Sequence, residues 1–519
     1  MAYSSINSGP SRGDEGSPSA SADELSPLLN RLLQEDDAIP TPSLYKAQST
    51  QKSMFALSKS IFLESLPVVL SYVLQVSIQT TAVLVVGRLG PEELSAAAFA
   101  LMLAFVTGWC VALGGTTALD TLGSQAFTGG TPTDLSVHFQ RGLVLLWLLF
   151  IPIAILWAHI RPVLMALGQT AELSENVQKY LTVLIIGGPA YIGFESLKKY
   201  LQCQGIMTYS TITLAFVFPV NIGLNIALVH FTPLKLVGSA LALSLSYWLI
   251  FISLGLMTYF SHTHTSNGAW SWISIRRVLD PRGCMSFLKL ALPGIVMVGT
   301  EWAAFEIVAI AAGNLGPLPL AAQSVIMTTD QILNTIPFGL GVAASARVGN
   351  LLGAQDPQGA KRAAHAAALV SVIAGTVIMI VLLATKDVFG VLFSSDPAVI
   401  HLVSRVMPLV ASFQVADGLA NSCGGVLRGQ GRQHLGAVFN IVAYYVLALP
   451  MGISLAFLTD LKLQGLWIGQ VVALFLVAMG EYAVVWKGTN WEKEVQKAVE
   501  RNQEEAKHGS IGPSPAVAP

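Results

Sequence analysis

Two carboxylates, Glu301 and Glu306, lie five residues apart in a stretch that otherwise carries no charge. The stretch, residues 291–313, reads ALPGIVMVGTEWAAFEIVAIAAG and is long enough to span a bilayer. An ionised side chain at membrane depth costs about 2.5–3.5 kcal/mol on insertion scales, and folding gives no reason to incur that cost twice on one helix. Carboxylates in such a place bind a proton, another ion or a cationic substrate. We therefore interpret Glu301 and Glu306 as binding residues.

Asp417 is a third acid inside a predicted membrane span, in the segment PLVASFQVADGLANSCGGVLRGQG. We assign it a proton- or substrate-binding role, with a structural hydrogen-bonding role as the alternative. Asp120 lies where the second span is expected to reach the cytosol, and there we interpret it as a structural residue that caps backbone groups or fixes a turn. Asn221, Tyr444 and Tyr445 also fall within predicted spans. They either line a polar cavity or form interhelical hydrogen bonds.

Several other chemistries are not indicated. The four cysteines are widely separated and form no CxxC pair, so we expect packing residues and neither a disulfide framework nor a metal site. The sequence has no G-x-x-x-x-G-K-[ST] loop, which excludes nucleotide hydrolysis by the P-loop route. The net charge of −1 gives no basic field for nucleic acid. We expect no cofactor and no enzymatic activity.

The composition indicates which elements position the acids. Of the 519 residues, 53% are hydrophobic and 11% are charged, against about 25% charged in soluble domains. Such a chain is a polytopic membrane protein whose main partner is the lipid bilayer. Twelve apolar runs of near-spanning length are predicted to be helices, at residues 61–86, 93–117, 143–160, 180–197, 210–230, 236–259, 287–313, 320–345, 363–385, 398–424, 435–457 and 464–486.

The two sets of six runs form an internal repeat. At an offset of 226 residues, Pro67 aligns with Pro293, and the Leu-Gly-Pro tripeptide at 89–91 aligns with that at 315–317. With six helices each, the halves share one orientation and are related by an axis along the membrane normal. The predicted fold is therefore all-α, with twelve transmembrane helices in two parallel six-helix repeats around a central cleft. That architecture is typical of alternating-access transporters.

The repeat shows that the acids belong to one half only. At the same offset, Glu301 aligns with Gln75 and Glu306 aligns with Thr80. A purely structural need of the scaffold would appear in both copies, so the asymmetry favours function. We expect a titratable centre in the C-terminal half with no N-terminal counterpart, and a cavity role for Gln75. At about 100° per residue the two glutamates point about 140° apart, so we expect them to have different roles.

Prolines lie at matched positions in the first helix of each half. A proline inside a helix removes one backbone hydrogen bond and loosens the helix. Pro67 and Pro293 therefore favour a pair of bending helices that take part in gating, with static kinks as the alternative.

The polar segments indicate the orientation and division of the chain. Basic residues such as Lys198, Lys199 and Arg428 fall in loops on the side of the N-terminus, so both termini are expected to be cytosolic. The charged segment from Asn490 is expected to be disordered. The expected division is a disordered cytosolic N-tail at 1–55, an N-lobe at 56–260, a cytosolic linker at 261–286, a C-lobe at 287–488 and a cytosolic C-tail at 489–519.

A sorting signal is predicted in the N-terminal tail. Glu24, Leu28 and Leu29 have the E-x-x-x-L-L spacing of an acidic dileucine motif, which a sorting adaptor would bind. Motifs this short also occur by chance. The motif favours the vacuolar membrane, and the plasma membrane is the alternative.

Four segments resemble motifs of the eukaryotic multidrug and toxic compound extrusion (MATE) family, and the resemblance covers residues 55–488. ALDTLGSQAF is similar to the family's second-helix motif, and EWAAFE to its seventh-helix motif E-W-W-A-[YF]-E. LQCQGI resembles the family's L-Q-x-Q-G-I loop after the fourth helix. CGGVLRGQGRQHLGAVFNIVAYYVLALPMG resembles the family's segment G-G-V-L-R-G-x-G-x-Q-x-x-G-A-x-x-N, which is followed by Y-Y and by G-x-P. Ala303 and Gly123 depart from the usual Trp and Cys. The long polar N-terminus suggests a fungal or other eukaryotic protein.

The resemblance implies a secondary active antiporter that exports small organic compounds, often cationic, in exchange for protons by alternating access. It implies that Glu301, Glu306 and Asp417 are the coupling acids. A sodium-coupled antiporter and a lipid-linked oligosaccharide flippase of the same superfamily are alternatives. A non-transporting membrane receptor is an alternative of another class.

Overall fold

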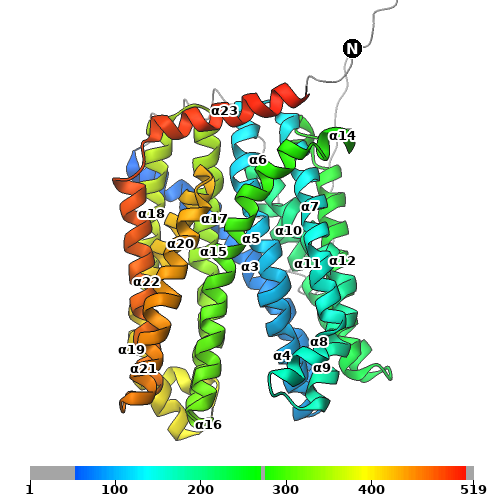
Figure 1. Cartoon of the computed structure of the whole chain (residues 1–519), viewed down its shortest axis with the longest axis vertical. Coiled ribbons are helices and arrows are strands. Elements are labelled where there is room, and N and C mark those ends of the chain that lie inside the picture. Colours follow the sequence, from blue (N-terminus) through cyan, green and yellow to red (C-terminus); the bar gives the residue numbers. More distant parts are fainter. Residues whose placement is uncertain (1–52, 271–274, 395, 510–519) are drawn as a thin grey trace, which may run out of the picture. The chain divides into compact units, whose positions relative to one another are not determined.

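The computed structural model describes residues 53–270, 275–394 and 396–509, all of which belong to the second of two units, 1–39 and 40–519 (Figure 1). The described residues are helical throughout, apart from turns and short connections. The N-terminal half contains α3 (Met54–Val86), α4 (Pro91–Ala104), the π-helix η1 (Phe105–Trp109), α5 (Cys110–Gly115), α6 (Thr117–Gly129), α7 (Pro132–Ala158), α8 (Ile160–Ala166), α9 (Ala171–Leu184), the short helix η2 (Ile185–Gly187), α10 (Gly188–Cys203), α11 (Thr208–His230) and α12 (Lys235–Tyr259). Two short helices follow, α13 (His262–Ser266) and α14 (Ile275–Val278). The C-terminal half contains α15 (Pro281–Asn314), α16 (Pro317–Leu333), α17 (Thr335–Gly353), α18 (Pro357–Phe389), η3 (Gly390–Leu392), α19 (Pro397–Gln430), α20 (Gln433–Asn440), the π-helix η4 (Ile441–Ala448), α21 (Leu449–Leu458), α22 (Leu463–Trp486) and α23 (Trp491–Gly509).

The helices have the lengths that a multi-span membrane protein requires. Within the described residues, eleven helical stretches are long and apolar enough to cross a membrane. The remaining expected span, 320–345, is present as α16 and α17, which are divided at Asn334. Pro337 explains the division, because it lacks the N–H that would bond to the carbonyl of Leu333. The predicted all-α membrane fold is confirmed.

Side-chain burial distinguishes the lipid-facing surface from the packed one. On α18, Leu369, Ile373 and Val377 recur every four residues and are each about half exposed, as expected of a helix face in contact with lipid. The other face packs closely against α19. A Cβ atom added to Gly375 would lie 2.6 Å from the carbonyl oxygen of Gln414. Small residues at such contacts let membrane helices approach each other closely.

The two halves also meet through small residues. A Cβ atom added to Gly114 of α5 would lie 2.5 Å from the Cα atom of Ile295 in α15. A Cβ atom added to Gly349 of α17 would overlap the hydroxyl of Ser124 in α6. The halves are therefore in close backbone contact along α5, α6, α15 and α17.

The expectation of disorder from Asn490 onward is wrong for residues 491–509, which form a helix. Helix α23 begins at Trp491 and lies across the ends of α6, α17 and α18 (Figure 1). It buries Trp491, Ala498 and Glu505 on one face, and the carboxylate of Glu505 pairs with Arg141 of α7 at 2.9 Å. The segment is too polar overall to be recognised from mean hydropathy, because its buried face combines a few apolar side chains with an ion pair.

Candidate functional site

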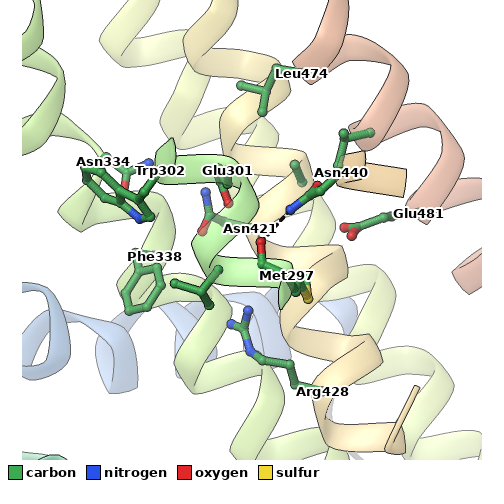
Figure 2. A pocket seen from close by; sticks show the side chains of 13 residues that line it. Met297, Glu301, Trp302, Asn334, Phe338, Asn421, Arg428, Asn440, Leu474 and Glu481 are labelled. Carbon is green, nitrogen blue, oxygen red and sulfur yellow. Dashed lines mark hydrogen bonds between the residues drawn. The ribbon is translucent and has the colours of Figure 1, made fainter. Parts of the chain in front are cut away.

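Glu301 of α15 faces a cavity in the C-terminal half (Figure 2). About 490 Å³ of space between these residues is free of atoms, and this figure includes space that is open to the surroundings. Its wall is formed by α15, α17, α19, α20 and α22, together with the break between α16 and α17. The polar or charged side chains in the wall are those of Glu301, Asn334, Asn421, Arg428, Asn440 and Glu481. The cavity thus combines two carboxylates, one guanidinium and three amides.

Hydrogen bonds from the neighbouring π-helix region hold the turn of α15 that carries Glu301. The side-chain amide of Asn440 donates to the carbonyl oxygen of Met297 at 2.8 Å. The hydroxyl of Tyr445, within η4, donates to the carbonyl oxygen of Thr300 at 3.0 Å. π-Helical segments inside longer helices are frequent at functional sites. Tyr445 therefore acts on the site through the backbone of α15.

Glu306 does not belong to the wall of this cavity. Its side chain is partly exposed, and it makes no hydrogen bond or ion pair with the other residues that the structure describes. The carboxylates of Glu301 and Glu306 therefore occupy different faces of α15.

Asp417 lies behind the cavity wall, buried in α19. Its Oδ2 accepts a hydrogen bond from the amide of Asn334 at 3.1 Å, and its Oδ1 accepts one from the amide of Asn421 at 2.8 Å. Both asparagines line the cavity. The structure thus connects Asp417 to the cavity through two amides, which satisfy its carboxylate where water is scarce.

Two further acids are buried in the C-terminal half, and neither is among the residues predicted from the sequence. Asp330 of α16 accepts a hydrogen bond from the amide of Gln414 at 3.2 Å. Glu481 of α22 lines the cavity and is 1% exposed, and neither of its carboxylate oxygens has a hydrogen-bond partner among the described residues. Each is a lone acid in a predicted apolar span. An ionised side chain at either position carries the same cost at membrane depth as Glu301 does.

The N-terminal half contains a buried charge cluster of its own, whose charged residues lie on α10 and not on α3, the helix that matches α15 in the repeat. The amide of Gln75 donates to the hydroxyl of Tyr191 at 3.0 Å and to Oε1 of Glu195 at 2.8 Å. Lys198 pairs with Glu195 at 2.8 Å, and both side chains are fully buried. Lys198 was predicted to lie in a loop, but α10 continues past it to Cys203.

The remaining predicted residues lie away from the cavity wall. The amide of Asn221 donates to the hydroxyl of Ser246 at 2.8 Å and links α11 to α12. Tyr444 is fully buried, and within the described residues its hydroxyl has no partner. Pro67 and Pro293 lie inside α3 and α15, and each helix continues through its proline.

Asp120 links the two halves, and its interpretation as a residue that caps backbone groups or fixes a turn is wrong. Lys199 of α10 donates to its two carboxylate oxygens at 2.9 and 3.1 Å. From the other half, Nε of Arg428 lies 3.6 Å from Oδ2 of Asp120. Arg428 was predicted to lie in a loop, but α19 continues to Gln430 and buries it.

Further hydrogen bonds close the interface around Asp120. The hydroxyl of Thr121 donates to the carbonyl oxygen of Arg428 and accepts a hydrogen bond from the amide of Gln433 at 3.0 Å. The amide of Gln125 donates to the carbonyl oxygen of Gly429 at 2.8 Å. We call this set of contacts between α6 and residues 428–433 the seal. It joins two of the segments that carry the family resemblance.

Comparison with known proteins supports the repeat and the fold. The MatE family model matches the chain twice, at residues 67–227 and 293–453. The starts of the two matches are 226 residues apart, and so are their ends, which confirms the offset found within the sequence.

Individual relatives match over most of the chain. An uncharacterized transporter of Schizosaccharomyces pombe is 37% identical over 436 residues, which cover 83% of this chain and 79% of that protein. Multidrug and toxin extrusion protein 2 of Mus musculus is 35% identical over 451 residues, which cover 86% of this chain and 76% of that protein. The crystal structure of a eukaryotic MATE transporter superposes with a TM-score of 0.81 at 32% identity, over 86% of this chain and 99% of that one.

Proposed function

This chain belongs to the MatE family of membrane transporters, and on that premise we propose that it exports organic cations in exchange for protons. The observation that carries the proposal is the cavity of Figure 2, into which the carboxylates of Glu301 and Glu481 both face. The name of the mouse relative, a multidrug and toxin extrusion protein, supports an organic substrate.

Competition between protons and the cationic substrate for the buried carboxylates would couple export of the substrate to movement of protons in the opposite direction. An ionised Glu301 attracts a cationic substrate, and a protonated Glu301 does not. At about 4 Å and an effective dielectric constant near 20, two unit charges attract each other by roughly 4 kcal/mol. Loss of that attraction corresponds to about a thousandfold change in affinity. Protonation from an acidic compartment is therefore sufficient to release a bound cation.

We assign distinct roles to the three predicted acids. Glu301 is the residue that the proton and the substrate share, because it borders the open space of the cavity. Asp417 responds through the amides of Asn334 and Asn421, which lie between it and that space. Glu306, which is partly exposed on another face of α15, is a separate proton-binding site.

Alternating access follows from the seal between the halves. The seal closes the interface between the halves on the side of the protein that carries α23. We propose that this side is cytosolic, so that in this conformation the cavity would be accessible from the opposite side of the membrane. The division into lobes at 56–260 and 287–488 remains part of this proposal. The sorting motif of Glu24, Leu28 and Leu29 lies outside the described residues, so the vacuolar and plasma membranes remain the two candidate locations.

The test is uptake of organic cations into vesicles that contain the purified protein. With an acidic lumen we expect uptake of a subset of a panel of labelled cations, and none after an ionophore dissipates the proton gradient. Glu301→Gln should abolish gradient-driven uptake, and Glu92→Gln, which removes an exposed carboxylate, should retain it. Uptake that follows an imposed sodium gradient and ignores the proton gradient would contradict the proposal.

A further inference from the structure

The guanidinium of Arg428 is buried but weakly held. The residue is 4% exposed, and its side chain borders both the cavity and the seal. Its Nε atom lies 3.6 Å from Oδ2 of Asp120, beyond normal hydrogen-bond length. Neither Nε nor Nη2 has a hydrogen-bond partner among the described residues. A buried charged donor without an acceptor is costly, so other positions of this side chain are close in free energy.

A second carboxylate lies on the cavity side of Arg428. A Cβ atom added to Gly424 would lie 3.4 Å from Oε2 of Glu481 and 3.8 Å from Nη1 of Arg428. The same Cβ atom would lie 2.7 Å from Cε of Met297, so the flexible end of Met297 is the side chain that must shift for the two charged groups to approach each other. Figure 2 shows Arg428 and Glu481 bordering the same space. Neither carboxylate oxygen of Glu481 has a hydrogen-bond partner among the described residues, so a donor such as Arg428 would stabilise it.

Asp120 does not depend on Arg428 alone. Lys199 donates to both of its carboxylate oxygens, so Asp120 stays paired if the guanidinium moves away. The backbone of Arg428 is held separately, because its carbonyl oxygen accepts the hydrogen bond from Thr121. The side chain can therefore change partner while α19 stays in place. The other carboxylate that borders the same cavity is that of Glu301.

We propose that Arg428 is an internal cation shared between Asp120 in the seal and Glu481 in the cavity, and that its position couples the charge of the cavity to closure of the seal. When the cavity is empty and Glu481 is ionised, the guanidinium moves toward Glu481 and its attraction for Asp120 is lost. When a bound organic cation neutralises Glu481, the guanidinium returns to Asp120. The seal then closes behind the cation. The biological meaning of this exchange rests on the proposed function, but the exchange itself does not.

The test measures closure of the seal without any transport. Spin labels at Thr133 of α7 and Gln358 of α18, after replacement of the native cysteines, report the distance between the halves on the side of α23. In the absence of substrate, Glu481→Gln should raise the ratio of short to long distances about tenfold over the parent. A tenfold change in population corresponds to about 1.4 kcal/mol. Asp120→Asn should lower the same ratio.

The variant Arg428→Gln shows whether Glu481 acts on closure of the seal through Arg428 or directly. In that background, Glu481→Gln should change the distance ratio by less than twofold. A response of equal size with and without Arg428 would overturn the proposal, and so would no response in the parent.

Gly424→Ala provides a second test that leaves every charge in place and does not need Arg428→Gln to fold. The added methyl group would separate Glu481 from Arg428, with only the flexible end of Met297 to displace. It should therefore raise the ratio of short to long distances as Glu481→Gln does, and a parental ratio would overturn the proposal. If these responses appear but proton-driven uptake into vesicles does not, the proposed function fails and the shared guanidinium stands.

Discussion

Replacing Glu505 by glutamine should release α23 from the helix ends that it covers. Arg141 donates to the two oxygens of Glu505 at 2.9 and 3.0 Å, and Arg141 is almost fully buried. Breaking a buried ion pair costs about 3–5 kcal/mol when the remaining charge has no other partner. Arg141 also donates to the carbonyl oxygens of Val278 and Arg277, each at 3.1 Å. We therefore expect a smaller loss, about 2 kcal/mol, since charged hydrogen bonds contribute roughly 1.5–3 kcal/mol.

The same contact predicts how the docking of α23 depends on pH. Burial alone raises the pKa of Glu505, but the hydrogen bonds from Arg141 and the charges of His138, Arg141 and Arg277 outweigh burial and lower it. Glu505 therefore stabilises docking fully at neutral pH. That contribution declines as the pH falls below the usual glutamate value of about 4.3 and is lost as the pH passes the lower folded pKa.

Hydrogen exchange of the α23 amides measures this effect locally. A loss of 2 kcal/mol corresponds to about 30-fold faster exchange at pH 7. Glu504→Gln is the matched control, because it removes the same charge from the exposed side of the helix. Equal exchange rates in the Glu505→Gln and Glu504→Gln proteins would refute this account of how α23 is held.

Two further substitutions test how the helices are positioned. Gly349→Ala adds a methyl group that would overlap the Ser124 hydroxyl across the interface, so the short distances between labels on the two halves should become at least tenfold rarer. An unchanged distance distribution would show that the halves do not close there. Tyr445→Phe removes only the hydroxyl that donates to the Thr300 carbonyl, a loss of about 1 kcal/mol. We expect weaker binding of a transported cation by about fivefold with little change in melting temperature, and parental affinity would argue against a positioning role.

The sequence was sufficient for the spans and for part of the site. Apolar runs of bilayer length identify membrane helices because the bilayer imposes one length and one chemistry on all of them. The cost of a buried charge identified Glu301 and Asp417 for the same reason. It applies equally to Glu481, which is the lone acid of the predicted span 464–486.

The sequence did not reveal which charges face each other. Glu301, Arg428 and Glu481 meet in one cavity only because α15, α19 and α22 pack together, and their rotations about their axes depend on contacts between distant segments. Hydropathy also places the ends of two helices before Lys198 and Arg428, whereas both helices continue past these residues. Pairing with Glu195 and proximity to Asp120 allow these two basic residues to be buried, and such partners are invisible along the chain.

Proton release by the purified protein tests the central claim most directly, because it records whether a cation and a proton compete for the same carboxylates. In weakly buffered detergent solution near neutral pH, addition of a cation found to be transported in the vesicle assay should release protons from the parent protein. Glu301→Gln should release measurably fewer, and Glu92→Gln should match the parent. Cation binding without proton release, or equal release from the parent and Glu301→Gln, would contradict the account.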